Sequence, residues 1–193
     1  GILENDFGAI NVDMLMLHEL RGDQCELEMI AGGCDAESHR RRFRTKLISM
    51  RMCGYDRVLV EPSGIYDVDE FFDVLREEPL DQWYEIGNVI AILDARLENN
   101  LSPQADYLLA SEAANAGKVI LSHADAATRK QCEDTVAHLN RALEQLRCDR
   151  RIDPEKDILQ TNLTDLTKED LQEVSKCGYR LESYRKMDLE NEQ

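Results

Sequence analysis

The sequence predicts an α/β fold: a layered, mostly parallel sheet flanked by helices. Apolar runs of strand length alternate along the chain with segments of helical spacing, the order typical of strand–helix–strand units. The clearest run, residues 88–94, has five consecutive apolar residues. Such a run indicates a strand covered on both faces, as strands of parallel sheets are. Glycines such as Gly54 and Gly117 follow helical segments and act as stop signals.

The expected elements follow from these patterns in chain order. Strands are expected at residues 2–3, 26–30, 57–61, 88–94, 118–122 and 158–159. Helices are expected at residues 37–53, 67–76, 106–116 and 126–147, with a last one from Thr167 to near Gly178. The run at 57–61 is expected to be buried, and Val136, Leu139, Leu143 and Leu146 are expected to form one core-facing stripe. Residues 181–193 are polar and are expected to be a disordered tail.

Composition excludes several classes of protein. The 193 residues carry 23 Lys and Arg against 39 Asp and Glu, a net charge of −16 that would repel a phosphate backbone, so we expect no nucleic-acid partner. No apolar run approaches the roughly 20 residues of a membrane span, and no leader pattern opens the chain, so we expect no membrane partner and a cytoplasmic location. Six scattered cysteines without a CxxC pair are expected to be free thiols.

Acidic or small polar residues follow nearly every predicted strand. Ligands of parallel α/β sheets bind at the carboxyl ends of the strands, so these residues are the first candidates for a site. Glu61, at the end of one strand with Gly64 three residues later, has the pattern of a carboxylate that holds Mg²⁺ or its water beside a phosphate. The alternative is an ordinary Pro-Ser-Gly turn.

Asp125 stands just after the next-to-last strand, in the segment Ser122-His123-Ala124-Asp125. A carboxylate at this place can accept two hydrogen bonds, from N1 and the exocyclic N2 of guanine. The alternative is that Asp125 is the N-cap of a helix beginning at Ala126.

Two further clusters are candidates for binding. Cys34, Asp35, Glu37 and His39 gather groups that suit Zn²⁺ and similar metals, although a loop leading into a helix explains them too. The segment Arg40–Arg51 holds six basic residues in an acidic chain. It could bind phosphates, an acidic partner or the chain's own carboxylates.

Taken in their order along the chain, these segments resemble the motifs of the P-loop GTPases of the CobW/HypB/UreG group, most closely those of the CobW-like branch. The matching segments are residues 2–13, similar to "IENEFG…D"; Gly33-Cys34, the start of a GCxCC metal motif; residues 56–64, similar to a Walker B stretch; residues 89–94, the strand after it; and residues 121–125, the guanine-specificity segment. The resemblance covers residues 1–180, most strongly the first 145.

The resemblance implies a GTP- and Mg²⁺-binding domain that hydrolyses GTP and handles a metal such as Zn²⁺ or Co²⁺, or a corrinoid. Its partners would be a guanine nucleotide and a metalloprotein or corrinoid-protein client; dimerisation is left open. Carried over by position, Glu61, Gly64 and Asp6 belong to the catalytic site, and Ser122, His123 and Asp125 to the base site. Glu4, Cys34, Glu37 and His39 belong to the metal site.

The sequence also departs from the family. The Walker A loop, GxxxxGK[ST], does not occur in the 193 residues, and we expect it upstream of Gly1, so that the fold is truncated and this chain alone is inactive as a GTPase. We likewise expect the family's C-terminal domain to lie outside these 193 residues. Ala36 and Glu37 stand where the metal motif has cysteines, and His123 stands where the specificity segment has lysine. Two alternatives are a non-catalytic interaction module that uses the basic helix 40–51, and a metal-buffering protein.

Overall fold

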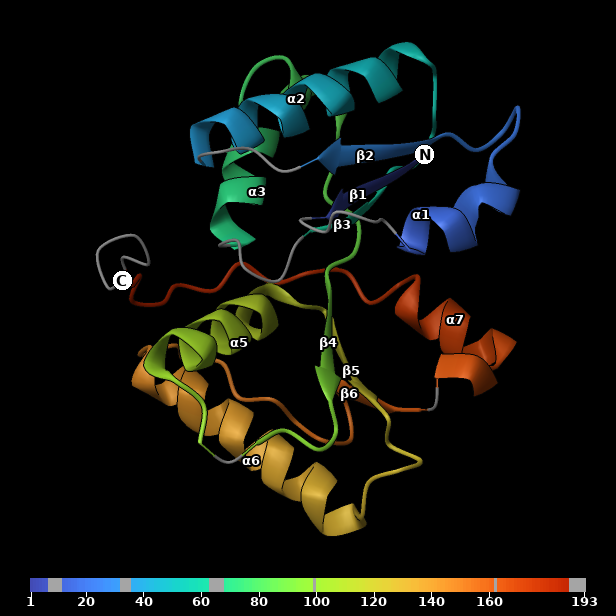
Figure 1. Cartoon of the computed structure of the whole chain (residues 1–193). Helices are drawn as coiled ribbons and strands as arrows, with labels where there is room; N and C mark the ends of the chain where they lie inside the picture. Colours follow the sequence, from blue (N-terminus) through green and yellow to red (C-terminus); the bar gives the residue numbers. More distant parts are fainter. Residues whose placement is uncertain (7–11, 32–35, 63–67, 99, 162, 188–193) are drawn as a thin grey trace. The chain divides into compact units, whose positions relative to one another are not determined.

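The computed structural model of the chain is an α/β structure that divides into two compact units, Gly1–Glu85 and Ile86–Gln193 (Figure 1). The structure describes residues 1–6, 12–31, 36–62, 68–98, 100–161 and 163–187. Each unit has its own three-stranded parallel sheet and its own helices, so the predicted α/β class is confirmed. None of the described helices combines the length and the apolar character that crossing a bilayer requires.

The first unit is built around the strand order β2-β1-β3. Its elements are β1 (Ile2–Asp6), α1 (Val12–Leu17), the 3₁₀ turn η1 (His18–Leu20), β2 (Leu27–Ala31), α2 (Ala36–Met52), β3 (Leu59–Glu61), α3 (Val68–Leu75) and α4 (Leu80–Trp83). In register, Glu4 of β1 lies between Met29 of β2 and Glu61 of β3. Glu4 and Glu61 are therefore direct neighbours on adjacent parallel strands.

Helix α2 provides the largest share of the core of this unit. Its stripe of Phe43, Leu47 and Met50, at most 2% exposed, packs with Leu3 and Ile30 of the sheet. The helical spacing of this stripe predicted the helix within one residue at each end. Gly54, two residues beyond the helix, has φ +83°, a conformation that glycine adopts without strain, and it ends the helical run as predicted.

The prediction that β3 is buried is wrong. The Leu59 and Val60 side chains are 58% and 38% exposed, and Glu61 is exposed too. Strand β3 is an edge strand of three residues, paired with β1 within the described sheet. A short run of apolar residues predicts a strand but does not reveal whether another element covers it, and here the described residues leave it open.

The second unit has the strand order β4-β5-β6, again all parallel. Its elements are β4 (Ile90–Asp94), α5 (Pro103–Asn115), β5 (Lys118–Ser122), α6 (Arg129–Gln145), β6 (Ile158–Gln160), the 3₁₀ turn η2 (Leu163–Asp165) and α7 (Lys168–Val174). Helix α7 begins after Thr167, whose side chain and that of Asp170 form a capping box, as its predicted start requires. Figure 1 shows α5 and α6 running beside one another in this unit.

Helices α5 and α6 cover one face of this sheet. The predicted stripe of α6 is confirmed, because Val136, Leu139, Leu143 and Leu146 are all at least 92% buried in the core cluster. The expectation that β4 is covered on both faces is wrong. Ala91 and Leu93 are buried against the helices, whereas Ile90 and Ile92 are 40% and 57% exposed. The described part of the chain thus covers β4 on one side.

The end of the chain packs on the second unit over the part that the structure describes. Tyr179 forms an antiparallel bridge with Ala116, and the Glu182 and Arg185 backbone amides donate to the Asn115 side chain and to the Leu146 carbonyl. The segment Leu181–Met187, expected to be disordered, is held by these contacts and by partly buried side chains. Residues 188–193 of the expected tail lie outside the described residues.

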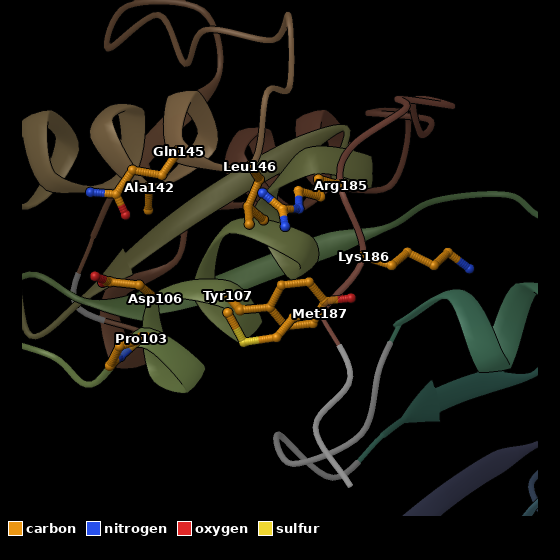
Figure 2. Close-up of a pocket in the computed structure, with 9 residues that line it drawn as sticks. All are labelled: Pro103, Asp106, Tyr107, Ala142, Gln145, Leu146, Arg185, Lys186 and Met187. Atoms are coloured by element: carbon orange, nitrogen blue, oxygen red, sulfur yellow. The ribbon is translucent and has the colours of Figure 1, made fainter. Parts of the chain in front are cut away.

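This segment closes a cavity of about 350 Å³ against α5 and α6 (Figure 2). Tyr107 of α5 lies beside Met187, and Arg185 lies near Leu146 at the end of α6. The lining residues are Pro103, Asp106, Tyr107, Ala142, Gln145, Leu146, Arg185, Lys186 and Met187.

The cysteines that the structure describes are free thiols, as predicted: Cys25, Cys53, Cys132, Cys148 and Cys177. Cys132 and Cys148 are buried in the core of the second unit.

Candidate functional site

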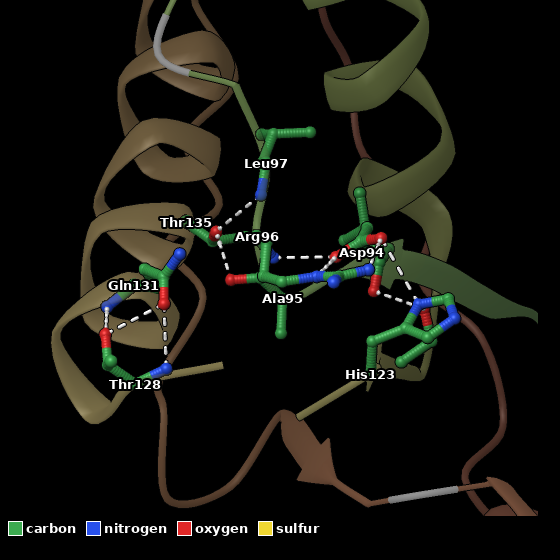
Figure 3. Close-up of polar contacts among 10 residues, drawn as sticks. Asp94, Ala95, Arg96, Leu97, His123, Thr128, Gln131 and Thr135 are labelled. Carbon is green, nitrogen blue, oxygen red and sulfur yellow. Dashed lines mark hydrogen bonds and ion pairs between the residues drawn. The ribbon is translucent and has the colours of Figure 1, made fainter. Parts of the chain in front are cut away.

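The best-defined polar cluster lies at the carboxyl ends of β4 and β5 (Figure 3). Asp94 and Ser122 are register partners and the last residues of these two strands. The residues that follow each strand therefore leave the sheet at the same edge, the place where parallel α/β sheets bind ligands. This edge brings together Asp94 and Arg96 from one loop with Ser122 and His123 from the other.

The Asp94 carboxylate connects the two loops. Its Oδ1 accepts hydrogen bonds from the Arg96 backbone amide at 2.8 Å and from the Arg96 Nε at 3.2 Å. Its Oδ2 accepts from the Arg96 Nη2 at 3.2 Å and lies 3.2 Å from the His123 Nδ1. The bonds from Arg96 hold the pKa of Asp94 below its usual range, so the carboxylate is ionised at neutral pH.

The loop that carries Arg96 is also fixed from α6. The Thr135 hydroxyl, in a side chain 3% exposed, donates to the Ala95 carbonyl at 3.0 Å and accepts from the Leu97 amide at 3.3 Å. These two bonds hold the backbone on both sides of Arg96, so its position is set by the core rather than by surface contacts.

The turn after β5 is held at its first two residues. The Ser122 hydroxyl donates to the Leu93 carbonyl at 3.1 Å, and His123 has φ +53°, a left-handed conformation that is uncommon for residues other than glycine. The Ala126 amide donates to the His123 carbonyl, which closes a four-residue turn. Asp125 stands exposed within this turn.

Asp125 is not the N-cap of the following helix. Thr128 is the cap of α6, because its hydroxyl accepts from the Gln131 amide and the Gln131 side chain accepts from the Thr128 amide (Figure 3). The helix begins at Arg129, three residues later than the sequence predicted. The structural alternative for Asp125 is thereby wrong.

The catalytic candidates belong to the first unit. Glu61 ends β3 and is exposed, whereas its register partner Glu4 is 2% exposed. Asp6 is the last residue of β1, and Gly64 lies outside the described residues. Glu61 belongs to the first unit and Asp125 to the second. A nucleotide site common to both residues therefore stays a prediction.

The metal candidates are placed differently from one another. Glu37 is exposed in the first turn of α2. His39 is 2% exposed, and its ring meets that of Phe71 edge-on at 6.1 Å. Burial, with a smaller contribution from the Arg42 charge, lowers the pKa of His39, so its imidazole is neutral at pH 7.

The predicted metal site also includes Glu4 and Cys34. Cys34 lies outside the described residues. Across the part of the chain that the structure describes, no three His, Cys, Asp or Glu side chains gather as a metal site requires. The described residues therefore do not by themselves fit a bound metal.

The basic helix uses part of its charge within its own unit. Arg40 and Arg44 both pair with Glu77, and Arg44 also donates to the Glu78 carbonyl at 2.7 Å. Lys46 pairs with Glu28 of β2. Of the three partners considered for this segment, the chain's own carboxylates are confirmed for these three side chains.

Sequence reasoning did not identify Arg96 and Thr135 as parts of the β4–β5 edge. A signal for Arg96 was present, because an acid and a base two residues apart at the end of a strand can bridge within one loop. No local signal marks Thr135, since its partners are about 40 residues earlier in the chain.

Comparison with known proteins decides the family. The family model described as "CobW/HypB/UreG, nucleotide-binding domain" matches residues 1–152, more than three quarters of the chain. The chain belongs to the CobW/HypB/UreG family. The P-loop GTPase resemblance of the strand-end motifs is thus confirmed at the level of the family, and the β4–β5 edge is part of its nucleotide-binding domain.

One curated relative is the zinc chaperone YeiR of Escherichia coli (strain K12), which is 28% identical to this chain over 97 residues. The aligned region is 50% of this chain and 29% of YeiR, so the chain spans less than a third of that relative. No solved structure matches the chain.

Proposed function

We propose that this chain belongs to a GTP-dependent metal chaperone, and that the β4–β5 edge binds the guanine base of the nucleotide. The observation that carries the proposal is the placement of Asp125. Its carboxylate is exposed in a turn directly after β5, at the ligand-binding edge of a parallel sheet, and Thr128 rather than Asp125 caps the next helix. A carboxylate so placed fits the N1 and N2 donors of guanine.

The other parts of the proposed GTP site follow from the family. Glu61, exposed at the end of β3, would hold Mg²⁺ or a water bound to it. Gly64 follows Glu61 by three residues, and Asp6 ends β1, the strand that pairs with β3. Ser122 and His123 would support the base site, since both anchor the turn that carries Asp125. Bound Mg²⁺ would neutralise phosphate charge, which this acidic chain otherwise repels.

Zinc is the metal we propose as cargo, with a zinc-requiring protein as client. The relative YeiR is named a zinc chaperone, and Cys34 and His39 supply ligand types that zinc accepts. His39 would have to leave its place beside Phe71 to bind a metal, so we propose Cys34, Glu37 and Glu4 as the first ligands to test. Free thiols are consistent with a reducing, cytoplasmic compartment.

Nucleotide binding is tested by titrating a fluorescent GTP analogue, with Mg²⁺, into the protein expressed from its natural reading frame with any residues that precede Gly1. Binding that GTP displaces and ATP does not is expected. Asp125→Ala should reduce GTP affinity by tenfold or more, because a charge-assisted bidentate contact is lost, at about 1.5 to 3 kcal/mol per charged hydrogen bond. Absence of binding, or equal displacement by ATP and GTP, would reject a guanine site.

Metal binding is tested separately by calorimetry with Zn²⁺ on the wild type and on Cys34→Ser. Cys53→Ser is the matched control, because Cys53 is an exposed free thiol in the same unit. Loss of heat in Cys34→Ser alone supports a zinc site at Cys34. Equal heats in all three proteins would end that part of the proposal.

A further inference from the structure

Asp94 lies between the Arg96 guanidinium and the His123 imidazole, which come from different loops. Both of its oxygens accept hydrogen bonds from Arg96, two residues later. The Oδ2 of the same carboxylate lies 3.2 Å from the Nδ1 of His123, which follows β5. Figure 3 shows the carboxylate between the Arg96 side chain and the His123 ring. Among the contacts at the β4–β5 edge, Asp94 and the Ser122 hydroxyl are the side chains that tie the two loops to one another.

The His123 contact acts on the turn that carries Asp125. His123 holds a left-handed conformation, which is unfavourable for a residue with a Cβ, and its carbonyl accepts a hydrogen bond from the Ala126 amide. A contact that favours this conformation is therefore needed to keep the turn as it is. The Asp94 carboxylate provides one at 3.2 Å from the His123 Nδ1.

The Arg96 contact acts on Asp125 in a second way. Asp94 bonds to the Arg96 guanidinium, and its hydrogen bonds and charge, with a smaller contribution from the Asp125 charge, raise the pKa of Arg96. The guanidinium donates two hydrogen bonds to Asp94 and the Arg96 backbone amide donates a third. Thr135 holds the backbone of the residues on either side of Arg96. If Asp94 were removed, Asp125 would be the carboxylate left for the guanidinium to pair with.

We propose that Asp94 is a positioning residue for base recognition: it stabilises the turn that presents Asp125 and keeps Arg96 from occupying the Asp125 carboxylate. This inference rests on the proposed guanine site. Asp94 itself need not touch the base, because its hydrogen-bonding positions are already filled by Arg96 and His123.

The test measures base selectivity by competition. A fluorescent GTP analogue bound to the protein, expressed with any residues that precede Gly1, is displaced by GTP, by inosine triphosphate, which lacks the exocyclic amine, or by ATP. The wild type is expected to prefer GTP over both. Asp94→Ala should lower the preference for GTP over ATP about tenfold, the coupling typical of contacting residues in one network.

Arg96 provides a second arm. In the double variant Asp94→Ala/Arg96→Ala the competing guanidinium is gone, so a part of the GTP preference should return. A loss of general stability would not be reversed by removing a second side chain. Failure of the preference to return overturns the role given to Arg96.

Glu133→Ala is the matched control, because Glu133 pairs with Arg129 at 2.8 Å on the exposed surface of the same unit. It should leave the selectivity unchanged. Circular dichroism reports whether each variant is folded, and Asp94→Asn, which keeps the shape but not the charge, replaces Asp94→Ala if the latter does not fold.

The outcomes separate the two proposals. If the wild type binds none of the nucleotides, the proposed function fails and this inference with it. If the wild type prefers GTP and folded Asp94→Ala keeps the same preference, the guanine site stands and the role of Asp94 is overturned. A shared loss of affinity for GTP, inosine triphosphate and ATP, with the preference unchanged, also overturns it.

Discussion

The Nε2 of His138 lies 2.6 Å from the Oδ1 of Asp106, so that the middle of α6 is joined to the first turn of α5. The side chains are 10% and 22% exposed, and this contact is made inside the core that holds the two helices together. The His138 Nδ1 is buried without a hydrogen-bond partner in the described structure, so Asp106 provides the polar contact of this imidazole.

Asp106→Ala should therefore destabilise the protein by about 1 to 3 kcal/mol, because it leaves a buried imidazole without its acceptor. The measurement is the urea midpoint followed by circular dichroism. Glu133→Ala, which breaks the exposed pair with Arg129, is expected to cost under about 0.5 kcal/mol. Equal losses of unfolding free energy in the two variants would show that the buried contact stabilises the protein no more than the exposed one.

Arg150 caps the end of α5 from within the core. Its side chain is 3% exposed, and its Nη1 donates to the Ala114 carbonyl at 2.8 Å and to that of Ala113. Last-turn carbonyls have no partner inside their own helix. Arg150→Met should lower the free energy of unfolding by about 1 to 3 kcal/mol and speed hydrogen exchange in the last turn of α5. A variant as stable as the wild type, with unchanged exchange, would refute the capping role.

Glu112 makes the folding stability depend on pH between about 4.5 and 7. Burial raises the pKa of this carboxyl to about 7 from an ordinary value of 4.5. As pH rises from about 4.5 to 7, the unfolded chain loses this proton while the folded chain keeps it, so folding stability falls and levels off above 7. The loss should reach about 2 to 3 kcal/mol. Urea unfolding at about pH 5 and pH 8 measures it, and Glu112→Gln should be the more stable protein at the higher pH.

His39 acts at the acidic side. Its folded pKa lies below the ordinary 6.5, so below that pH the unfolded chain takes up a proton that the folded chain resists. The first unit should lose stability as pH falls below about 6.5, at roughly 1 kcal/mol per pH unit until the folded imidazole is protonated. Trp83, the single tryptophan, lies in the same unit and reports its unfolding by fluorescence. His39→Phe keeps an aromatic ring beside Phe71 and should flatten the dependence; an unchanged slope would implicate other groups.

Periodicity and stop signals predicted the strands and the longer helices well, missed the short helices α1 and α4, and predicted the surroundings of the elements poorly. The stripe of Phe43, Leu47 and Met50 determines a helix by itself, because helical spacing is a local property. Whether a strand such as β4 is covered on its second face depends on distant parts of the chain, and Ile90 has the same local sequence pattern in either case. Helix α6 begins late because the Thr128–Gln131 capping box, a signal present in the sequence, overrides the apolar pattern.

The site was predictable in its place and not in its contacts. Parallel strands end at one edge, so Asp94 and Asp125 could be assigned to the same region from their positions alone. The contacts of Asp94 with Arg96 and His123 depend on side-chain rotamers. The anchoring of the loop that carries Arg96 depends on Thr135, in a helix about 40 residues away. His39 was predicted as a ligand from its neighbours in sequence, but its burial beside Phe71 follows from the packing of α2 on α3.

The uncovered face of β4 has a consequence for handling the protein. Ile90 and Ile92 offer an apolar surface on which two molecules can associate, and mutual repulsion from a net charge of −16 opposes such encounters at neutral pH. Near pH 4.6, the isoelectric point, that repulsion vanishes. Concentrated solutions should therefore turn cloudy as they are acidified or as salt is added, well before the helices melt.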